Sequence, residues 1–355
     1  MSLRDLLLGR IATTGPLTVA DYMADCLLHP TLGYYTTRDP LGAKGDFVTA
    51  PEISQMFGEM LGLCLAQSWM DQGRPDPFAL VELGPGRGTL MADMLRVGRA
   101  VPGFVEAARI HLVEASPALR AVQGRTLTGH SPTWHQTVDD LPDLPTFLVA
   151  NEFLDALPIR QYVRDGAAWR ERLVTVQDGA LTFALAPPMP VPELAHHDVP
   201  DGTMVERCPA LPGVVQSIAG RIEQGGVALI IDYGHWRSQG DTLQALRDHT
   251  PEDPLTTPGG ADLTAHVDFE AVARASGPAQ ASAMTRQGVF LERLGITARA
   301  QALARGLTGD ALAAHVAAHR RLTHPAEMGD LFKVIALAPP GAPLPPGVDA
   351  MGDLT

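Results

Sequence analysis

The feature that most constrains this chain is a short apolar run that ends in a cluster of glycines and continues into a helical pattern. Phe78–Leu83 is the apolar run, residues 84–88 read Gly-Pro-Gly-Arg-Gly, and residues 89–96 have helical spacing. Glycines at alternate positions let the backbone bend tightly and approach a ligand where a Cβ atom would collide. The helix after them offers free amide groups and the positive end of its dipole. The segment therefore predicts a strand, a ligand-binding turn and a helix.

Further strands and helices alternate along the chain. Apolar runs rich in β-branched residues occupy residues 108–114, 146–150, 226–232 and 331–337. After the first of these runs, Ser116 and Pro117 supply a cap and a first-turn proline for another helix. Strands separated by helices predict an α/β fold with a mostly parallel sheet that is covered by helices on both faces.

Before the glycine cluster, apolar residues recur at three- and four-residue intervals over residues 49–69, as expected for one face of a buried helix. Thr49 is the predicted cap, Pro51 suits the first turn, and Glu52 is placed to reach back to the cap amide. The preceding residues 41–47 are interrupted by glycines and are predicted to form a loop.

A different pattern, typical of antiparallel strands, interrupts the alternation at residues 161–190. Apolar residues alternate there around Asp165-Gly166 and Asp178-Gly179, which are turn signals. We therefore predict a helical N-terminal region that includes a lid (1–75), a core (76–158 and 213–338), an antiparallel β insertion (159–212) and a flexible tail (339–355).

Charge and cysteine content narrow the possible partners. The sequence has 27 Lys and Arg against 40 Asp and Glu, a net charge of −13 that disfavours nucleic acid and favours a basic protein or a cationic substrate. The three cysteines, Cys26, Cys64 and Cys208, indicate neither a disulfide framework nor a zinc site. No apolar stretch approaches the roughly 20 residues of a membrane span, and residues 1–10 are a poor secretory leader, so we expect no membrane insertion and a cytoplasmic location.

The glycine spacing indicates the cofactor. Gly84, Gly86 and Gly88 follow G-x-G-x-G rather than the G-x-G-x-x-G of dinucleotide folds, which favours S-adenosyl-L-methionine, although a purely structural tight turn is the alternative. Glu114 ends the second strand, where a carboxylate can accept both hydrogen bonds of a ribose diol. An exposed strand-end acid is the other interpretation, and the glycine loop upstream outweighs it. The candidate cofactor-binding residues are Glu82, Gly84, Gly86, Gly88, Glu114 and Asn151.

Acidic residues follow the third strand at the edge where ligands bind. Asn151 and Glu152 come directly after that strand, and the carboxyl ends of parallel strands border one crevice. Glu152 and Asp155 together could grip a guanidinium group through paired hydrogen bonds, which a lysine could not match. Asp155 has a second interpretation, because an acid also stabilises the first turn of a helix through the dipole.

Several of these segments together resemble the MidA-type methyltransferases. The resemblance rests on residues 45–54, 82–88, 151–158, 231–234 and 262–269, and it extends from about residue 22 to residue 334. One departure is the segment 285–291, where the family more often has adjacent Thr and Gln, so this segment is left out of the site.

The resemblance implies a class I, Rossmann-like fold with a seven-stranded sheet and S-adenosyl-L-methionine as cofactor. It also implies methyl transfer to an arginine of a protein substrate, a quinone-site subunit of respiratory complex I, in support of that complex's assembly. Nothing in the composition or the spacing itself names arginine.

Two further residues are candidates for the chemistry. His266 titrates near neutral pH and could remove a proton during methylation, or it could hydrogen-bond backbone and organise its loop. Asp46 lies in the glycine-flanked loop, where a lid could close over a substrate. The candidate catalytic residues are Glu152, Asp155, Asp46 and His266. No metal is predicted, because the sulfonium of the cofactor is already an activated methyl donor and the other histidines lack companion ligands.

Three other functions compete with protein methylation. A small-molecule methyltransferase would have a closed apolar pocket rather than an acidic groove. A nicotinamide-dependent oxidoreductase is disfavoured by the glycine spacing. An assembly chaperone that keeps a cofactor fold without catalysis would bind cofactor and transfer no methyl group.

Overall fold

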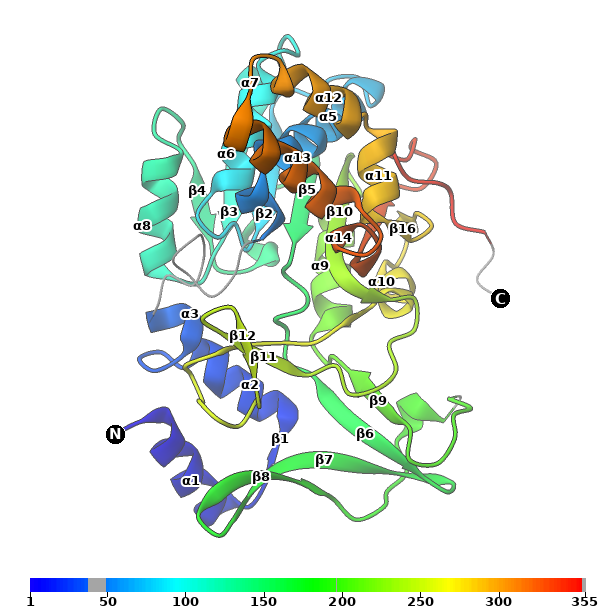
Figure 1. Cartoon of the computed structure of the whole chain (residues 1–355). Coiled ribbons are helices and arrows are strands. Elements are labelled where there is room, and N and C mark those ends of the chain that lie inside the picture. The colour runs from blue at the N-terminus through cyan, green and yellow to red at the C-terminus, as the bar shows by residue number, and fades with distance from the viewer. Residues whose placement is uncertain (38–48, 196, 353–355) are drawn as a thin grey trace.

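The computed structural model describes residues 1–37, 49–195 and 197–352. In Figure 1 a large sheet and its covering helices form the upper part of the molecule, the core. Below it lies a smaller assembly of helices and antiparallel strands that includes the N-terminus. The two parts are built from interleaved stretches of the chain, since the segments of the smaller assembly precede β2, lie between β5 and β10, and follow β10.

The core sheet has the strand order β15-β17-β10-β5-β2-β3-β4, and β14 and β16 pair at its margins with β10 and β17. The strands are β2 (Phe78–Leu83), β3 (Ala108–Val113), β4 (Thr133–His135), β5 (Thr146–Asn151), β10 (Gly226–His235), β14 (Val267–Asp268), β15 (Gln280–Ala281), β16 (Thr285–Arg286) and β17 (Phe332–Ala338). β4, β3, β2, β5 and β10 run parallel to one another, whereas β17 pairs antiparallel with β10. All residues of β2, β5 and β17 are buried, which is why their sequences are mostly apolar. The predicted mostly parallel α/β sheet is confirmed.

Two hydrophobic clusters cover the two faces of this sheet. One joins the sheet to α5 (Gln55–Asp71) and α6 (Thr89–Gly98), and the other joins it to α9 (Leu211–Ile222) and α10 (Phe269–Ala275). The remaining core helices are α4 (Ala50–Ile53), α7 (Phe104–Ala107), α8 (Pro117–Thr126), α11 (Gln287–Arg293), α12 (Ile296–Ala304), α13 (Gly309–Thr323) and α14 (Met328–Leu331). Helices therefore lie on both faces, as the alternating pattern predicted.

The smaller assembly joins the N-terminal helices to the β insertion. Its elements are α1 (Leu3–Thr14), β1 (Leu17–Thr18), α2 (Val19–Leu28), α3 (Tyr34–Thr37), β6 (Arg160–Asp165), β7 (Ala168–Gln177), β8 (Ala180–Leu185), β9 (Met204–Arg207), β11 (Gln244–Arg247), β12 (Thr250–Glu252) and β13 (Asp262–Thr264). β1 pairs with β7, and a shared hydrophobic cluster packs the N-terminal helices against the strands. The predicted turns at Asp165-Gly166 and Asp178-Gly179 connect β6 to β7 and β7 to β8.

The single helix predicted over residues 49–69 is wrong in detail. Ser54 has an extended backbone (φ −163°) that separates α4 from α5, and its hydroxyl accepts a hydrogen bond from the Met56 amide at 3.2 Å. Thr49 makes no side-chain cap. Glu52 does not reach back to it, because its carboxylate accepts a hydrogen bond from Thr89 at the start of α6. The loop predicted at 41–47 lies outside the described residues.

Two other local features, the cap of α8 and the C-terminal tail, can be compared with their predictions. The Ser116 hydroxyl accepts a hydrogen bond from the Leu119 amide and caps α8, as expected. The tail predicted to be flexible is held where it is described: Asp349 pairs with Arg293 of α11 at 2.8 Å, and the Cys64 thiol donates to the Pro346 carbonyl. None of the helices in the described ranges is long and apolar enough to cross a membrane.

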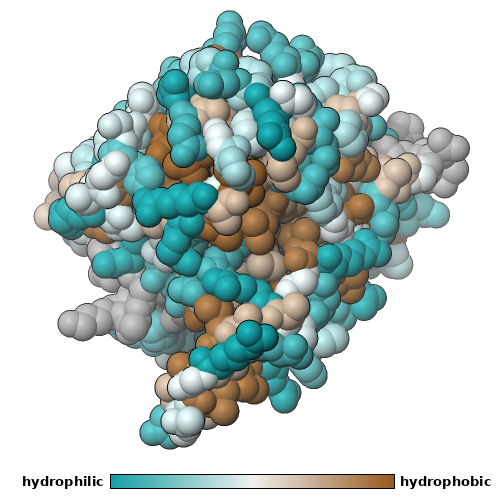
Figure 2. All heavy atoms as spheres, turned by 90° about the horizontal axis from the view of Figure 1, so that it is seen from above, coloured by the Kyte–Doolittle hydropathy of each residue, from teal (hydrophilic) through white to brown (hydrophobic). Residues whose placement is uncertain are grey.

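Hydrophobic and hydrophilic side chains are unevenly distributed over the surface of the core. Seen from above, hydrophobic side chains gather near the middle of the visible face, and hydrophilic side chains surround them (Figure 2). On α13 only Leu322 is buried, while Val316 is 56% exposed. Apolar side chains on this helix are therefore not all directed into the core.

A buried carboxylate ties three core helices together. Glu59 of α5 has no exposed surface, and it accepts hydrogen bonds from Arg96 of α6 at 2.5 Å and from Arg299 of α12 at 2.6 Å. Burial alone would raise the pKa of Glu59, but the hydrogen bonds from Arg299 and Arg96 outweigh it and lower the pKa. The ion pairs thus hold the carboxylate in its charged form.

We predict that Glu59→Gln lowers the free energy of unfolding at pH 7 by about 1–2 kcal/mol, less than for a fully buried pair because both guanidinium groups are partly exposed. A carboxylate with a lowered folded pKa contributes stability above its unfolded pKa and loses that contribution as the pH falls. The difference between the variant and the wild type should therefore shrink below about pH 4. Urea denaturation at both pH values measures this, with Glu106→Gln on the surface of α7 as the control.

Candidate active site

A cavity of about 640 Å³ lies at the carboxyl ends of the core strands, and residues of the smaller assembly form part of its wall. Its core lining includes the glycine loop after β2, the ends of β3, β5 and β10, and the start of α6. Its other lining comes from α2, α3, β11 and β13. Nearly all the residues predicted from the sequence as site residues line this cavity.

The glycine loop adopts backbone conformations that suit glycine. Gly84, Gly86 and Gly88 have φ values of 59°, 52° and 81°. A Cβ atom on Gly84 would lie 3.0 Å from the ring of Phe153, so this loop also packs closely against the segment after β5. A side chain at these positions would be strained, and Gly84 and Gly86 line the cavity.

Glu114 lies at the same end of the cavity and is held in place. Its carboxylate accepts hydrogen bonds from the Ser116 amide at 2.7 Å and from Gln123 at 3.1 Å. Burial raises the pKa of Glu114 above its usual value. The residue is 8% exposed and lines the cavity, so the expectation of an exposed strand-end acid is not met.

Gln123 of α8 is a residue that the sequence did not reveal. Its amide group donates to Glu114 and also to the Gly86 carbonyl at 2.8 Å, while Trp134 donates to its oxygen at 2.8 Å. One buried side chain therefore fixes both the glycine loop and the acid beside it. In the sequence Gln123 is only a polar residue within a helix, and no local pattern marks it.

Two oxygen atoms in the cavity wall have no hydrogen-bond partner among the described residues. They are Glu82 Oε2 and Asn151 Oδ1, which belong to residues 3% and 8% exposed. Burial raises the pKa of Glu82 strongly. Buried acceptors without donors are costly, so these atoms fit bound ligands that bring N–H groups.

Glu152 has an unusual backbone and a raised pKa. Its φ is 50°, and its carboxylate accepts hydrogen bonds from the Ala50 amide at 3.1 Å and from the Asn151 side chain at 3.0 Å. Burial, assisted by the nearby charge of Asp155, raises the pKa of Glu152 to about 7. Such an acid exchanges a proton near neutral pH, which an exposed glutamate does not.

Asp155 belongs to a buried acidic group that includes Asp232 at the end of β10. The Asp232 carboxylate accepts hydrogen bonds from the Leu154 amide at 3.0 Å and from the Asp155 amide at 3.2 Å. Tyr233 donates its hydroxyl to the Asp155 carboxylate. Burial raises the pKa of both aspartates, and the charge of Asp155 raises that of Asp232 further. Asp232 and Tyr233 lie within β10 and in the segment 231–234 that carries the family resemblance, but the sequence did not mark them as site residues.

His266 also lines the cavity. The centroid of its ring lies 5.4 Å from that of the Tyr233 ring, and the two rings pack edge to face. Its Nδ1 has no hydrogen-bond partner among the described residues. Its backbone amide, not its ring, donates to the Thr242 hydroxyl at 2.9 Å. Burial, and then the charge of His235, lowers the pKa of His266, so the ring is neutral near pH 7.

The structure thus brings together nine of the predicted site residues and leaves one outside the description. Cavity-lining residues include Glu82, Gly84, Gly86, Glu114, Asn151, Glu152, Asp155 and His266. Gly88 begins α6 directly behind the loop. Asp46 lies outside the described residues. On the wall of the smaller assembly, Tyr35 and Asp262 line the cavity and were not predicted.

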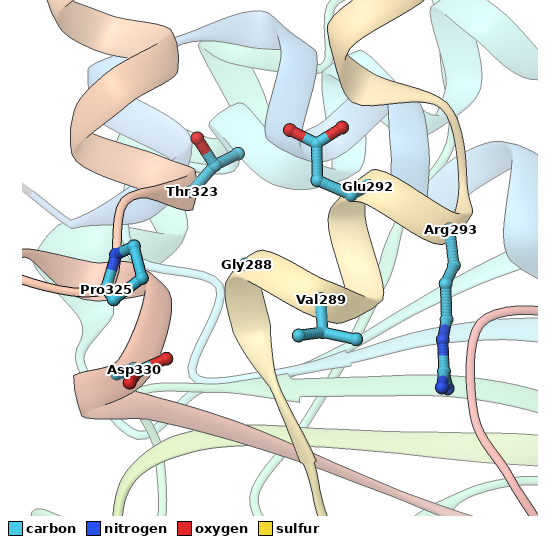
Figure 3. A pocket seen from close by; sticks show the side chains of 7 residues that line it. All are labelled: Gly288, Val289, Glu292, Arg293, Thr323, Pro325 and Asp330. Carbon is cyan, nitrogen blue, oxygen red and sulfur yellow. The ribbon is translucent and has the colours of Figure 1, made fainter.

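A second hollow, of about 470 Å³, contains none of the predicted residues. Figure 3 shows Val289, Glu292 and Arg293 on α11, with Thr323 and Pro325 on a neighbouring segment and the Arg293 side chain pointing away from them. The segment 285–291, left out of the predicted site, contributes to this hollow rather than to the larger cavity. Among the described residues no group of three or more His, Cys, Asp or Glu side chains could hold a metal ion.

Comparisons with known proteins agree with this geometry. Residues 60–288 match the model of a family described as S-adenosyl-L-methionine-dependent methyltransferase. The chain is 37% identical, over 94% of its length and 82% of the relative, to the human protein arginine methyltransferase NDUFAF7, mitochondrial. The Xenopus laevis protein of the same name is 39% identical over 94% of this chain and 83% of its own.

A solved structure supports the fold and the cofactor. A protein from Burkholderia thailandensis, crystallised with S-adenosyl-homocysteine, superimposes with a TM-score of 0.80 at 30% identity, covering 98% of this chain and 92% of its own. S-adenosyl-L-methionine, predicted from the glycine spacing, is confirmed as the cofactor.

The expected cytoplasmic location is contradicted, because the names of the relatives carry the label mitochondrial. The expectation depended on a short N-terminal apolar patch, and such a patch does not determine the compartment in which a folded enzyme acts.

We predict that Gly86→Val abolishes S-adenosyl-L-methionine binding, measured by titration calorimetry, while the circular dichroism spectrum remains that of the wild type. A branched side chain at φ 52° is strained and would occupy space that the loop leaves to the cofactor. Gly166→Val is the matched control, because Gly166 has a similar φ of 57° and a Cβ atom added there would meet no other atom within 4 Å. Unchanged affinity in the Gly86 variant, or equal loss in the Gly166 variant, would contradict the placement of the cofactor.

Proposed function

The chain belongs to the MidA-type family of S-adenosyl-L-methionine-dependent methyltransferases, and from this premise we propose that it methylates arginine side chains of a protein substrate. We further propose that the substrate is a quinone-site subunit of respiratory complex I and that the modification assists assembly of that complex. The relatives named as protein arginine methyltransferases support the first part. The motif resemblance supports the second.

The observation that carries the proposal is the set of carboxylates beside the cofactor end of the cavity. Glu152 and Asp155 line the cavity together with the acceptor Asn151 Oδ1. A guanidinium group presents five N–H donors in a plane and carries a positive charge, so it satisfies several acceptors at once. The net charge of −13 also favours a basic substrate over an anionic one.

The cofactor is held by the glycine loop and the residues beside it in the cavity wall. Glu114, fixed by Gln123, suits a ribose diol, and the glycine loop gives backbone access. Glu82 Oε2 is an acceptor placed for the ammonium of the cofactor. When bound, S-adenosyl-L-methionine supplies a methyl group that is attached to a positively charged sulfur. The sulfur is a good leaving group, so the methyl group is activated for transfer.

Glu152 orients the nitrogen that is methylated and accepts its proton. A guanidinium group holds its proton strongly, with a pKa above 12, so its nitrogen is a poor nucleophile until a carboxylate aligns it. Because burial raises the pKa of Glu152 to about 7, its carboxylate is a stronger base than an exposed one and takes the proton as the new bond forms. Asp155, held by Tyr233, places a second carboxylate at the same end.

The experiment that tests the function is a transfer assay. The purified protein is incubated with radiolabelled S-adenosyl-L-methionine and with complex I subunits, and labelled residues are identified by mass spectrometry. We expect label on an arginine. Binding of the cofactor without transfer would favour the chaperone, and transfer only to small molecules would favour a small-molecule methyltransferase.

We predict that Glu152→Gln removes most methyl transfer to the protein substrate and changes cofactor affinity by less than about threefold, under about 1 kcal/mol. The amide keeps the size of the side chain but neither carries the charge nor accepts the proton. The variant is compared in the transfer assay and by calorimetry with Glu106→Gln. Wild-type turnover by the variant, or loss of its cofactor binding, would assign Glu152 another role.

We also predict that transfer depends on pH through Glu152. The reactive form is the carboxylate, and a raised acid pKa means that this form is lost below about pH 7. The kcat/KM for the protein substrate should rise about tenfold per pH unit below pH 7 and level off above it. A flat profile between about pH 5.5 and pH 8.5 would contradict a role for Glu152 as proton acceptor.

A further inference from the structure

One carboxylate of the cavity wall comes from the smaller assembly. Among the described residues the acids that line the cavity are Glu52, Glu82, Glu114, Glu152, Asp155 and Asp262. All but Asp262 are on the core side, in α4 or at the ends of core strands. Asp262 begins β13, which pairs with β11 in a three-stranded sheet. Residues on both sides of the cavity thus provide negative charge.

Asp262 is fixed by a tyrosine from a distant part of the chain. The Tyr35 hydroxyl lies 2.9 Å from Asp262 Oδ1 and 3.0 Å from Oδ2, so it donates to both oxygens. Asp262 is 5% exposed, and Tyr35 and Asp262 both line the cavity. The Tyr35 hydroxyl holds the carboxylate in one orientation at this wall.

The charge of Asp155, on the core side, also influences the Tyr35 hydroxyl. Burial raises the pKa of Tyr35, and the charges of Asp262 and Asp155 raise it further. The acidic groups of the two walls are therefore near enough to influence a single side chain. Asp155 and Asp262 both line the cavity, so each wall presents a carboxylate to a cation bound in it.

An independent observation points to a donor-rich ligand at this end. Asn151 Oδ1 lines the cavity, belongs to a residue more than nine-tenths buried, and has no hydrogen-bond partner among the described residues. The arginines of the lining are Arg87 and Arg321. In the described part of the lining the acids outnumber the arginines, and the ligand that completes the Asn151 acceptor carries N–H groups.

We propose that Asp262 is a second carboxylate for the guanidinium group of the substrate, and that Tyr35 is the positioning residue that orients it. This inference rests on the proposed arginine substrate. Carboxylates on two walls suit a planar fork of donors better than a compact ammonium group, so the pair determines selectivity for arginine over lysine. The smaller assembly then takes part in substrate recognition as well as in closing the cavity.

The test uses a bisubstrate probe, so that no protein substrate is needed. In this probe the methyl group of S-adenosyl-L-methionine is replaced by a short alkyl chain that ends in guanidine, with nitrogen in place of sulfur. Two comparators end in neutral urea and in an amine. Dissociation constants are measured by calorimetry on the full chain, together with that of S-adenosyl-homocysteine.

The wild type should bind the guanidine probe at least tenfold more tightly than the urea probe. Asp262→Asn should reduce this preference about tenfold and leave the affinity for S-adenosyl-homocysteine within about threefold. Tyr35→Phe should reduce the preference about threefold, because the carboxylate stays and loses only its orientation. Asp248→Asn, an exposed acid in the turn between β11 and β12, is the matched control and should change neither value.

One result would contradict the proposed arginine substrate, and another would contradict the proposed role of Asp262. If the wild type does not prefer guanidine, the proposed arginine substrate is wrong. If the wild type prefers guanidine and Asp262→Asn keeps that preference, the role of Asp262 is wrong while the proposed function stands. An equal loss of S-adenosyl-homocysteine affinity would assign Asp262 to the cofactor. If Asp262→Asn fails to fold, Tyr35→Phe decides, and an unchanged preference in it overturns the inference.

Discussion

The arrangement of the active end depends on one buried carboxylate, Asp232. It has no exposed surface, and it accepts the amides of Leu154 and Asp155 in the segment that follows β5. These bonds link the end of β10 to the turn after its neighbouring strand and so fix the backbone on which Glu152 and Asp155 stand. The cost of burying a charge is reduced because amide donors surround it and because burial favours its protonated form.

Burial has the same effect on most acids of the cavity. The pKa values of Glu82, Glu114, Glu152 and Asp155 are all raised, with loss of water as the largest cause. Acids in this condition gain from a bound cation more than exposed acids do, because the cation replaces the missing solvation. A positively charged cofactor bound in the cavity is therefore stabilised by these buried acids.

The smaller assembly is a composite that no contiguous stretch of the chain forms alone. β1 pairs with β7, and the Tyr22 hydroxyl of α2 donates to the Pro254 carbonyl at 2.6 Å. These contacts place α3 beside β13 and thereby bring Tyr35 to Asp262 across 227 positions of sequence. The cavity wall opposite the core therefore depends on pairing between the N-terminal region, the β insertion and the segment after β10.

The sequence by itself determined the core strands, the glycine loop, the cap at Ser116 and most of the predicted residues that line the cavity, because each has a local signature: an apolar run, a glycine spacing, or a cap followed by proline. It also placed Glu152 and Asp155, since polar residues after a parallel strand border the crevice. It did not find the break at Ser54, Gln123, or the pair of Tyr35 and Asp262. These depend on the tertiary structure, because a carboxylate and its hydroxyl partner far apart in the chain leave no periodic trace, and only the packing of the smaller assembly against the core brings them to one cavity.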